Sequence, residues 1–519
     1  MPRFFNTTGP CEPEYHYTLS PTARLPTIEG LVERRQYFVI HAPRQTGKTT
    51  AMRALAEAMR AKGLAACWAT LESARGMDDV ERAEPNIIDA LHDASRKLPE
   101  AWRAPDPTPA LQRPVGRRLG AFVEAWAGTL TVPLVLLLDE ADTITGPAMV
   151  NLLSQLRAGF MDRGVGKFPT SIALIGLRDL RDYLAEAKGG RALNAGSPFN
   201  ISAGSLTLRN FNAEEVADLV SQHTAETGQG FAPEAVSELH RLTDGQPYLV
   251  NALADLCVTD LVPDRATPIT QAHVDAAREQ LILARRTHLD NLAERLKEPR
   301  VARIVEAALL GDAPRSVAYD SDNFQYVLDL GLLKLGRLGA EAANPIYREV
   351  LLRQLTYNLQ LSLPLPWWPW ASPEGRLDFP ALLAGFRQWW RENSEALAKE
   401  PSAYPEAAPH LTLCAFLQRV VNGGGRVHRE FATGRGAMDL LVAYGPDRFG
   451  VEIKRIRDHD GPETIVSAGV KQLSACLDTL GLDHGWLVIF DVRPDRSWDD
   501  RLWQREVDHN GRRVTVLGA

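Results

Sequence analysis

The sequence His41-Ala42-Pro43-Arg44-Gln45-Thr46-Gly47-Lys48-Thr49-Thr50 decides the fold of the first half of the chain. It follows the apolar stretch 37–40, which predicts a short buried strand, and it precedes residues 51–60, which have a helix-forming composition. A strand, a loop that ends in Gly-Lys-Thr and a helix together predict a phosphate-binding loop. Backbone N–H groups of such a loop and the helix N-terminus point at one spot, where anions collect.

The loop supplies most of the side chains that we expect to bind ATP. They are Pro43, Arg44, Gln45, Thr46, Gly47, Lys48, Thr49 and Thr50. We expect Lys48 to reach the β- and γ-phosphates and the Thr49 hydroxyl to hold Mg²⁺. Ala42 stands where the usual pattern has its first glycine, whereas the Gly-Lys-Thr end is intact. The alternative is a loop that has this sequence by chance.

A second motif supports the first. The apolar run 133–138 ends at Asp139 and Glu140, which predicts a central strand buried on both faces of a parallel sheet. Acids at the carboxyl end of such a strand lie where ligands bind in these sheets. We expect Asp139 to orient Mg²⁺ through water and Glu140 to polarise the water that attacks ATP. The alternative is an apolar strand that simply leads into an acidic loop.

Two further apolar stretches, 64–70 and 171–177, alternate with helical segments and predict a doubly wound parallel α/β sheet. Arg178 follows the second stretch, beside the acidic strand, and could contact the γ-phosphate as a sensor or finger in cis. A surface ion pair with Asp179 or Asp182 is the alternative for Arg178.

The region after the sheet is predicted to be helical. Asn212 and Glu215 have the spacing of a capping box at a helix start. Gly245-Gln246-Pro247 before an apolar helix resembles the lid motif of signalling-type P-loop ATPases, which implies that Pro247 packs near the adenine. A plain turn at a helix start is the alternative.

Residues 263–360 have the pattern of a winged helix, with helices followed by a hairpin. The presumed recognition helix begins with acidic residues, Asp320 and Asp322, whereas contact with phosphates needs Lys or Arg. We therefore expect this module to pack on the ATPase core as a reporter of conformation. In the following linker, 361–404, three tryptophans lie among prolines, and we expect them to dock on a neighbouring domain.

The C-terminal segment carries a second group of charged residues on predicted strands. Asp439 begins one strand, and Glu452 and Lys454 lie two positions apart on its hairpin partner, so that all three can share one face. Two carboxylates bind Mg²⁺ through oxygen, and a lysine can orient or activate the water that attacks a phosphodiester. Gln472 lies on the next predicted helix. An alternating strand that ends in charges would produce the same motif by chance.

Composition limits the partners. The net charge is −7, so any nucleic-acid site must be local. The five cysteines have no metal-ligand spacing, which favours reduced thiols and a cytoplasmic protein. No apolar run is long enough to cross a bilayer, so we expect no membrane partner.

Motifs along the whole chain resemble those of a family of bacterial AAA-type ATPases related to STAND signalling ATPases and to initiator-like ATPases of replication origins. The matching segments are 5–11, 41–50, 176–183, 197–200 and 344–350. The C-terminal segment resembles the PD-(D/E)xK nuclease superfamily. These resemblances imply ATP and Mg²⁺ as cofactors, Asp439 and Glu452 as metal ligands, DNA as the partner of the C-terminal domain, and assembly into a homo-oligomer as an option. A third metal ligand is expected from Glu406 or Glu430.

The domains that we predict are an ATPase core at 1–204, a helical lid at 205–262, a winged helix at 263–360, a linker with a helix at 361–404 and a nuclease-like domain at 405–519. Two functions remain open at this point. One is an ATPase switch that controls a metal-dependent nuclease. The other is an ATPase switch whose nuclease-like tail is inactive and only binds nucleic acid or a partner protein.

Overall fold

The chain divides into two compact units in the computed structural model. The first comprises Met1–Thr287, Ala318–Leu335 and Ala342–Ile346, and the second comprises His288–Val317, Gly336–Glu341 and Tyr347–Ala519. The structure describes residues 3–177, 202–284, 287–309, 322–336, 339–362, 370, 376–399, 408–421, 425–432, 437–456, 461–491, 493 and 496–519.

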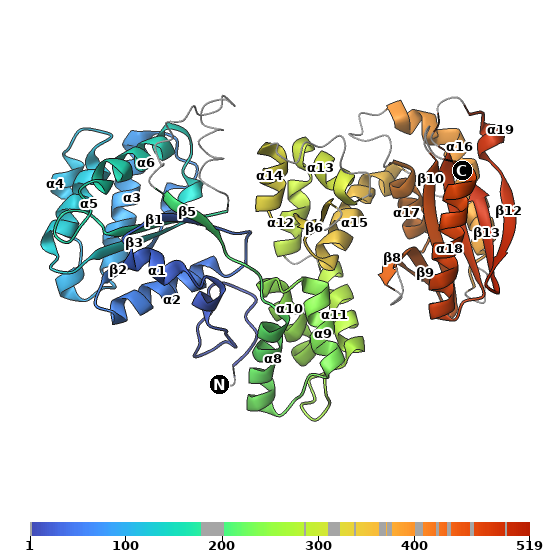
Figure 1. Cartoon of the computed structure of the whole chain (residues 1–519), viewed down its shortest axis with the longest axis horizontal. Helices are drawn as coiled ribbons and strands as arrows, with labels where there is room; N and C mark the ends of the chain where they lie inside the picture. The colour runs from blue at the N-terminus through green and yellow to red at the C-terminus, as the bar shows by residue number, and fades with distance from the viewer. Residues whose placement is uncertain are drawn as a thin grey trace. The chain divides into compact units, whose positions relative to one another are not determined.

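The first unit is built on a parallel sheet, as the sequence predicts. Its strands are β1 (Tyr37–His41), β2 (Ala65–Thr70), β3 (Leu134–Asp139), β4 (Ser171–Gly176) and β5 (Ser202–Thr207). Their order is β2-β3-β4-β1-β5, and all the pairs are parallel (Figure 1). The strand that follows the acidic one in sequence, β4, does lie beside it. The sequence analysis missed β5, whose Ser-Ala-Gly-Ser composition has low β propensity and which pairs with β1.

Helices cover both faces of this sheet. They are α1 (Ile28–Glu33), α2 (Lys48–Ala61), α3 (Val80–Ser95), α4 (Thr108–Leu111), α5 (Arg118–Thr129) and α6 (Gly146–Phe160). Alternate strand residues enter two separate cores, because successive side chains point to opposite faces. Leu136 and Leu138 pack with α3, α5 and α6, whereas Val135 and Leu137 pack with α1 and α2. The predicted two-sided burial of β3 is therefore confirmed.

The lid region is helical. The segment predicted as a lid, 205–262, contains α8 (Ala213–Thr227), α9 (Pro233–Thr243), α10 (Pro247–Leu256) and a π-helical turn at Cys257–Leu261. The next helix, α11 (Gln271–Leu283), begins the segment predicted as a winged helix. The predicted capping box is confirmed, since Asn212 accepts from the Glu215 backbone N–H at 2.8 Å and Glu215 accepts from the Asn212 N–H at 2.9 Å.

The segment predicted as a winged helix has helices and then a hairpin. The elements are α12 (Thr287–Arg295), α13 (Pro299–Leu309), α14 (Asp322–Asp329), β6 (Leu333–Gly336), β7 (Gly339–Ala342) and α15 (Pro345–Ser362). This segment is shared between the two compact units. A winged-helix domain with its own boundaries therefore stays a prediction.

The C-terminal part of the second unit is a six-stranded mixed sheet between helices. Its elements are α16 (Phe379–Lys399), α17 (Ala408–Val421), β8 (Gly425–Ala432), β9 (Ala437–Tyr444), β10 (Asp447–Ile456), α18 (Pro462–Leu480), β11 (His484–Asp491), α19 (Trp498–Arg501), β12 (Gln504–His509) and β13 (Arg512–Gly518). The strand order is β12-β13-β11-β10-β9-β8. One core joins α16 and α17 to one face of the sheet, and another joins α18 to the opposite face. Of the linker tryptophans, Trp370 packs on Gly385 of α16, while Trp367 and Trp368 lie outside the described residues.

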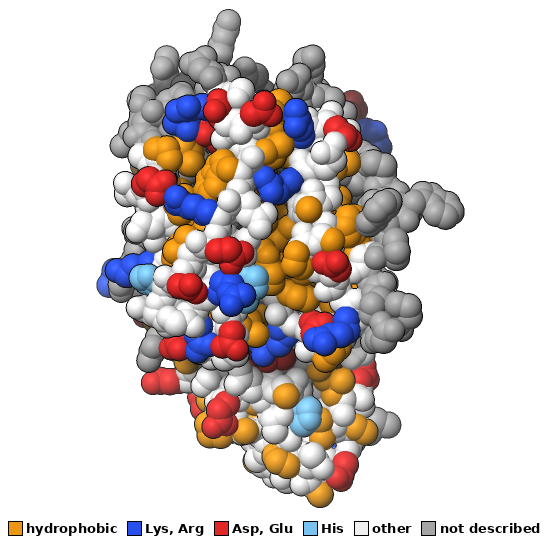
Figure 2. Space-filling model, turned by 90° about the vertical axis from the view of Figure 1, so that its right-hand side faces the viewer, with side chains coloured by type: hydrophobic (Ala, Val, Ile, Leu, Met, Phe, Trp, Pro, Cys, Tyr) orange, Lys and Arg blue, Asp and Glu red, His pale blue; other side chains and the backbone are white. Residues whose placement is uncertain are grey.

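The face of the second unit that carries β12 has basic and acidic side chains interspersed, with hydrophobic side chains between them (Figure 2). Within the part of the chain that the structure describes, none of the helices has both the length and the hydropathy of a membrane span.

A buried carboxylate joins three helices of the first unit. Glu84 of α3 is 2% exposed and accepts from the backbone N–H groups of Gly116 at 2.7 Å and Arg118 at 3.0 Å. It also accepts from the Gln155 side chain of α6 at 2.8 Å. Glu84 thus satisfies donors at the start of α5, which that helix leaves without partners of its own.

We expect Glu84→Ala to destabilise the first unit by about 3 kcal/mol, because several buried donors lose their acceptor together. Urea-induced unfolding followed by circular dichroism measures this loss. Glu124→Ala, which removes an exposed carboxylate from α5, is the matched control and should change stability by less than about 0.5 kcal/mol. Equal effects of the two substitutions would contradict the capping role.

Candidate functional site

The predicted phosphate-binding loop is wound tightly between β1 and α2. Gln45 and Gly47 have left-handed backbone conformations, with φ angles of 58° and 86°. The Lys48 amine donates to the carbonyls of Ala42 at 2.5 Å and Pro43 at 2.8 Å. Part of the Lys48 side chain is exposed, but its amine lies inside the loop, where desolvation lowers its pKa to about 8 against the opposing charges of Asp142 and Asp139. A phosphate in the loop would offer this amine a stronger acceptor than the carbonyls.

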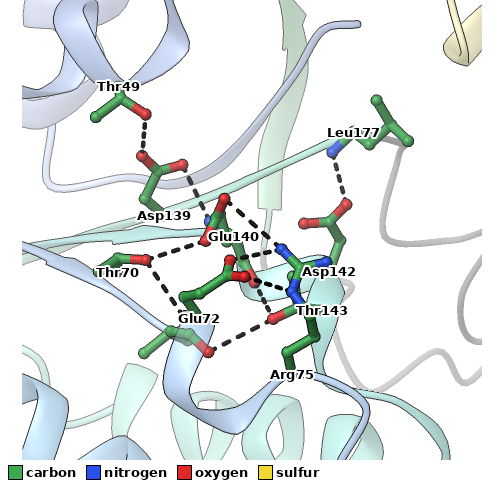
Figure 3. A network of polar contacts seen from close by, with 10 residues as sticks. Thr49, Thr70, Glu72, Arg75, Asp139, Glu140, Asp142, Thr143 and Leu177 are labelled. Carbon is green, nitrogen blue, oxygen red and sulfur yellow. Dashed lines mark hydrogen bonds and ion pairs between the residues drawn. The ribbon is translucent and has the colours of Figure 1, made fainter. Parts of the chain in front are cut away.

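The two residues predicted to hold Mg²⁺ beside the phosphates are brought together. The Thr49 hydroxyl donates to Asp139 Oδ2 at 2.8 Å (Figure 3). Asp139 is 2% exposed, and its other oxygen accepts from the Glu140 backbone N–H at 3.0 Å. A hydroxyl and a carboxylate are oxygen ligands that suit a hard cation, so the residues present fit Mg²⁺.

Trp68 of β2 also contacts Asp139, and the sequence analysis did not identify it. Its indole N–H donates to Asp139 Oδ2 at 3.3 Å, and Arg53 lies over its ring at 4.6 Å. β2 pairs with β3 in a register that sets Thr70 opposite Asp139. Only this register, which the sequence does not reveal, places Trp68 within reach of the acid.

Glu140 lies next to Asp139 in a restrained position. Its backbone is left-handed, with φ of 56°, and its carboxylate accepts from the Thr70 hydroxyl at 3.1 Å. Arg75 lies 3.9 Å from the same carboxylate and forms a closer ion pair with Glu72 at 2.5 Å (Figure 3).

The charges around Glu140 separate the pKa values of two neighbouring carboxyl groups. Burial and the neighbouring Glu72 raise the pKa of Glu140 to about 7. Hydrogen bonds from Arg75 lower the pKa of Glu72 to about 2. A carboxylate with a pKa near neutrality, at the end of a strand that carries a metal-ligand candidate, is suited to accept a proton from water.

The end of β4 is fixed to the acidic loop. The Leu177 backbone N–H donates to Asp142 Oδ2 at 2.8 Å, and a side chain at Gly176 would meet Asp142 Cβ at 2.9 Å. Arg178, the predicted γ-phosphate sensor, lies outside the described residues, so its role stays a prediction.

The lid reaches the phosphate-binding loop through the predicted Gly-Gln-Pro motif. The Gln246 side-chain amide donates to the Gln45 carbonyl at 3.3 Å. Gly245 has φ of 68°, and a Cβ there would lie 1.8 Å from the Phe211 carbonyl oxygen. Pro247 is the first residue of α10 and is buried. The motif is therefore at the loop, while the expected contact between Pro247 and adenine stays a prediction.

The remaining loop residues have varied surroundings. Arg44 is exposed, and Pro43 packs against Gly331, where a side chain would lie 2.4 Å from Pro43 Cγ. The Thr50 hydroxyl accepts from the backbone N–H of Cys11 at 3.0 Å, so the N-terminal leader lies against the start of α2.

The structure also brings together the charged residues of the second unit. Asp439 Oδ2 accepts from the Ile453 N–H at 2.7 Å, and Glu452 Oε2 accepts from the Asp439 N–H at 3.3 Å. The Lys454 amine donates to Glu452 at 2.5 Å and to Gln472 of α18 at 3.1 Å. Asp439, Glu452, Lys454 and Gln472 thus form one cluster, which we call the carboxylate–lysine cluster.

Burial shapes the chemistry of this cluster. Glu452 is 0% exposed, and burial, together with the nearby Asp439, raises its pKa to about 7, with Lys454 acting in the opposite direction. Two carboxylates fit a hard cation, although Glu452 is also paired with Lys454. Among the described residues there is no group of three or more His, Cys, Asp or Glu side chains that could hold a metal. The expected third ligands lie beyond that description, since Glu406 and the side chain of Glu430 are not part of it.

Comparisons with known proteins give weak structural likenesses. No protein-family model matches the chain, and no curated protein matches it. A Walker-type ATPase of Pyrococcus abyssi is similar with a TM-score of 0.47 and 15% identity over 67% of this chain and 99% of its own. The ORC2 protein of Aeropyrum pernix, solved as ADPNP and ADP complexes, has a TM-score of 0.41 and 14% identity over 66% of this chain and 93% of its own. The Thermotoga maritima RuvB Holliday junction branch migration motor has a TM-score of 0.34 and 13% identity over 63% of this chain and 92% of its own.

Because Trp68 shares an acceptor oxygen with Thr49, we expect its fluorescence to change when ADP and Mg²⁺ are added together. Trp68→Phe should remove this change, whereas Trp102→Phe, which alters a tryptophan away from Asp139, should preserve it. The measurement is the difference in emission with and without Mg²⁺ at a fixed ADP concentration. An unchanged signal in Trp68→Phe would contradict the contact.

Proposed function

We propose that the first unit binds and hydrolyses Mg-ATP and that its nucleotide state controls a metal-dependent nuclease site in the second unit. The observation that carries the ATPase part is the 2.8 Å contact between Thr49 and Asp139, with Glu140 beside it. This contact joins the end of the phosphate-binding loop to the acidic strand, and neither element alone would support hydrolysis.

Each residue of the nucleotide site has a defined task in this proposal. The loop N–H groups and Lys48 would bind the phosphates, and Thr49 and Asp139 would hold Mg²⁺, with Asp139 acting through water. The metal, when bound, neutralises charge on the phosphate oxygens. Glu140 orients the attacking water and accepts its proton, which its pKa of about 7 permits near neutral pH. Arg178 contacts the γ-phosphate, and Pro247 packs near the adenine.

The carboxylate–lysine cluster supports the nuclease part. Asp439 and Glu452 would hold Mg²⁺, and Lys454 would orient the water that attacks a phosphodiester in DNA. Gln472 fixes the lysine by accepting from its amine. Gly469 of α18 allows this approach, because a side chain there would lie 3.3 Å from Lys454 Cγ and 2.8 Å from Leu487.

A second candidate function is favoured by two observations on the same unit. Glu452 is fully buried and already paired with Lys454. The face that carries β12 has basic and acidic side chains interspersed, which suits a partner protein better than nucleic acid (Figure 2). Under this alternative the tail binds nucleic acid or a partner protein without cutting, and the ATPase part is unchanged. Cytoplasmic location and homo-oligomeric assembly stay predictions under both candidates.

We expect Lys48→Ala to abolish ATP hydrolysis and weaken nucleotide binding, because the phosphates lose their main counter-ion. Glu140→Gln should bind ATP with near wild-type affinity while turnover falls at least about 100-fold. Equilibrium binding and steady-state phosphate release separate the two effects. Wild-type turnover in Glu140→Gln would show that another group activates the water.

The pH dependence follows from the raised pKa of Glu140. Only the ionised carboxylate can accept a proton, so turnover should rise with pH through a pKa of about 7. Glu72→Gln removes the negative charge that raises this pKa, and the rise should move to lower pH. Profiles of kcat against pH for both proteins measure the shift, with the exposed Glu81→Gln as control. A rise that stays in place would exclude Glu72 as its cause.

We expect Lys454→Ala and Asp439→Asn to abolish cleavage of plasmid DNA in Mg²⁺ or Mn²⁺. ATP turnover should stay within about twofold, a barrier change below ~0.5 kcal/mol, because neither residue belongs to the nucleotide site. Lys471→Ala, which removes an exposed lysine of α18 next to Gln472, is the matched control. Cleavage that survives both cluster substitutions would favour the binding-only alternative.

A further inference from the structure

Arg24 is a buried cation that the proposed chemistry does not use. It ends the short 3-10 helix Pro21–Arg24 in the leader and is 6% exposed. Its guanidinium nitrogen Nη1 donates to the Thr46 carbonyl at 2.8 Å and to the Arg209 carbonyl at 3.1 Å. One side chain therefore ties the phosphate-binding loop to the segment that leads from β5 into the lid.

The contact with Thr46 determines which way the loop's N–H groups point. In a planar trans peptide, the carbonyl of one residue and the N–H of the next point in opposite directions. Holding the Thr46 carbonyl on the Arg24 side therefore turns the Gly47 N–H to the other side of the chain. Gln246 holds the Gln45 carbonyl in the same way and so orients the Thr46 N–H. Two consecutive N–H groups of the loop are thus aimed by side chains outside it.

The Arg24 guanidinium packs so closely on the loop that Gly47 has little room for a side chain. A Cβ atom on Gly47 would lie 2.9 Å from Arg24 Nη2. Thr46 itself is 2% exposed, and its hydroxyl donates to the Pro43 carbonyl at 2.9 Å. The loop has little freedom to move without displacing Arg24.

Arg24 also contacts the segment that leads from β5 into the lid. The Arg24 guanidinium carbon stands 4.9 Å from the centre of the Phe211 ring, and the Phe211 N–H donates to the Gly245 carbonyl at 2.9 Å. Arg209 forms an ion pair at 2.6 Å with Glu215, which lies in the first turn of α8 and completes its capping box with Asn212. A shift of Arg24 would therefore displace contacts at the first turn of α8 and at the start of α10.

Burying a guanidinium against carbonyls is costly, which argues that its position matters. Desolvation lowers the pKa of Arg24 to about 10, with Glu215 opposing this effect, so the side chain remains charged at neutral pH. An apolar side chain of similar length would fill the same space, but it would leave the buried Thr46 carbonyl and the partly buried Arg209 carbonyl without this donor.

We propose that Arg24 is a positioning residue. It orients the N–H groups of the phosphate-binding loop, and it transmits the binding of nucleotide in that loop to the lid. This role rests on nucleotide binding by the first unit. It predicts that Arg24 contributes both to affinity for any nucleotide with a β-phosphate and to the response of the lid once nucleotide is bound.

Three variants of the full-length chain test the proposal with ADP and Mg²⁺. Arg24→Met removes the donors and keeps the length, Arg24→Lys keeps a buried cation, and Arg60→Met is the matched control. Arg60 also donates to a backbone carbonyl, that of Ala66 at 3.2 Å, but from the last turn of α2. The measurements are the ADP dissociation constant and amide hydrogen exchange over residues 209–216 and 245–253, with no ADP and with saturating ADP.

Arg24→Met should bind ADP at least tenfold more weakly and lose the ADP-dependent protection of both lid segments even at saturation. Arg24→Lys should recover part of the affinity and part of the protection, and Arg60→Met should match wild type. If Arg24→Met does not fold, the partial loss expected in Arg24→Lys carries the test. ADP affinity within twofold of wild type and intact lid protection in both Arg24 variants would overturn the proposal. Failure of the wild-type chain to bind ADP would instead overturn the proposed function.

Discussion

The hydrogen bond between Thr49 and Asp139 is the contact on which the candidate nucleotide site depends, because it joins the phosphate-binding loop to the acidic strand. It joins two elements that β4 separates in the sheet, so it can form only if β1, β4 and β3 are in parallel register. A slip of one residue along β3 would turn Asp139 to the opposite face of the sheet, away from Thr49. The geometry of the candidate site therefore depends on the pairing of β1, β4 and β3 across the sheet.

The sequence predicted the elements that have strong local signals. The phosphate-binding loop, the acidic strand and the strands that carry Asp439 and Glu452 are where the hydrophobic pattern and the motifs place them. The contacts that tune these elements could not be predicted in the same way. Trp68, Thr70 and Glu72 act on Asp139 or Glu140 across the β2–β3 pair, and Arg24 acts across a separation of 22 residues from Thr46. Such contacts depend on register and loop path, for which a single sequence carries no local signal.

Glu140 and Glu452 lie at different sheets, and their pKa values are raised by similar causes. Glu140 and Glu452 both have a pKa near 7, with desolvation as the largest cause and a neighbouring carboxylate as a further one. They differ in what opposes this shift, which is a hydroxyl from Thr70 in one case and the Lys454 ammonium in the other. A group paired with an ammonium can exchange that partner for a metal ion, whereas a group held by a hydroxyl remains available to accept a proton. Under the proposed function Glu452 exchanges Lys454 for a metal ion and Glu140 acts as a base, whereas under the alternative Glu452 keeps its ion pair with Lys454.

The enclosed amine of Lys48 has a consequence for the heat of nucleotide association. With its pKa near 8, an appreciable fraction of the amine is neutral in mildly alkaline solution before nucleotide arrives. Phosphate oxygens favour the ammonium form, so association above that pH draws a proton from the buffer. The enthalpy measured by titration calorimetry then includes the ionisation enthalpy of the buffer and differs between HEPES and Tris at the same pH. The same proton uptake makes the complex weaken as the solution becomes more alkaline.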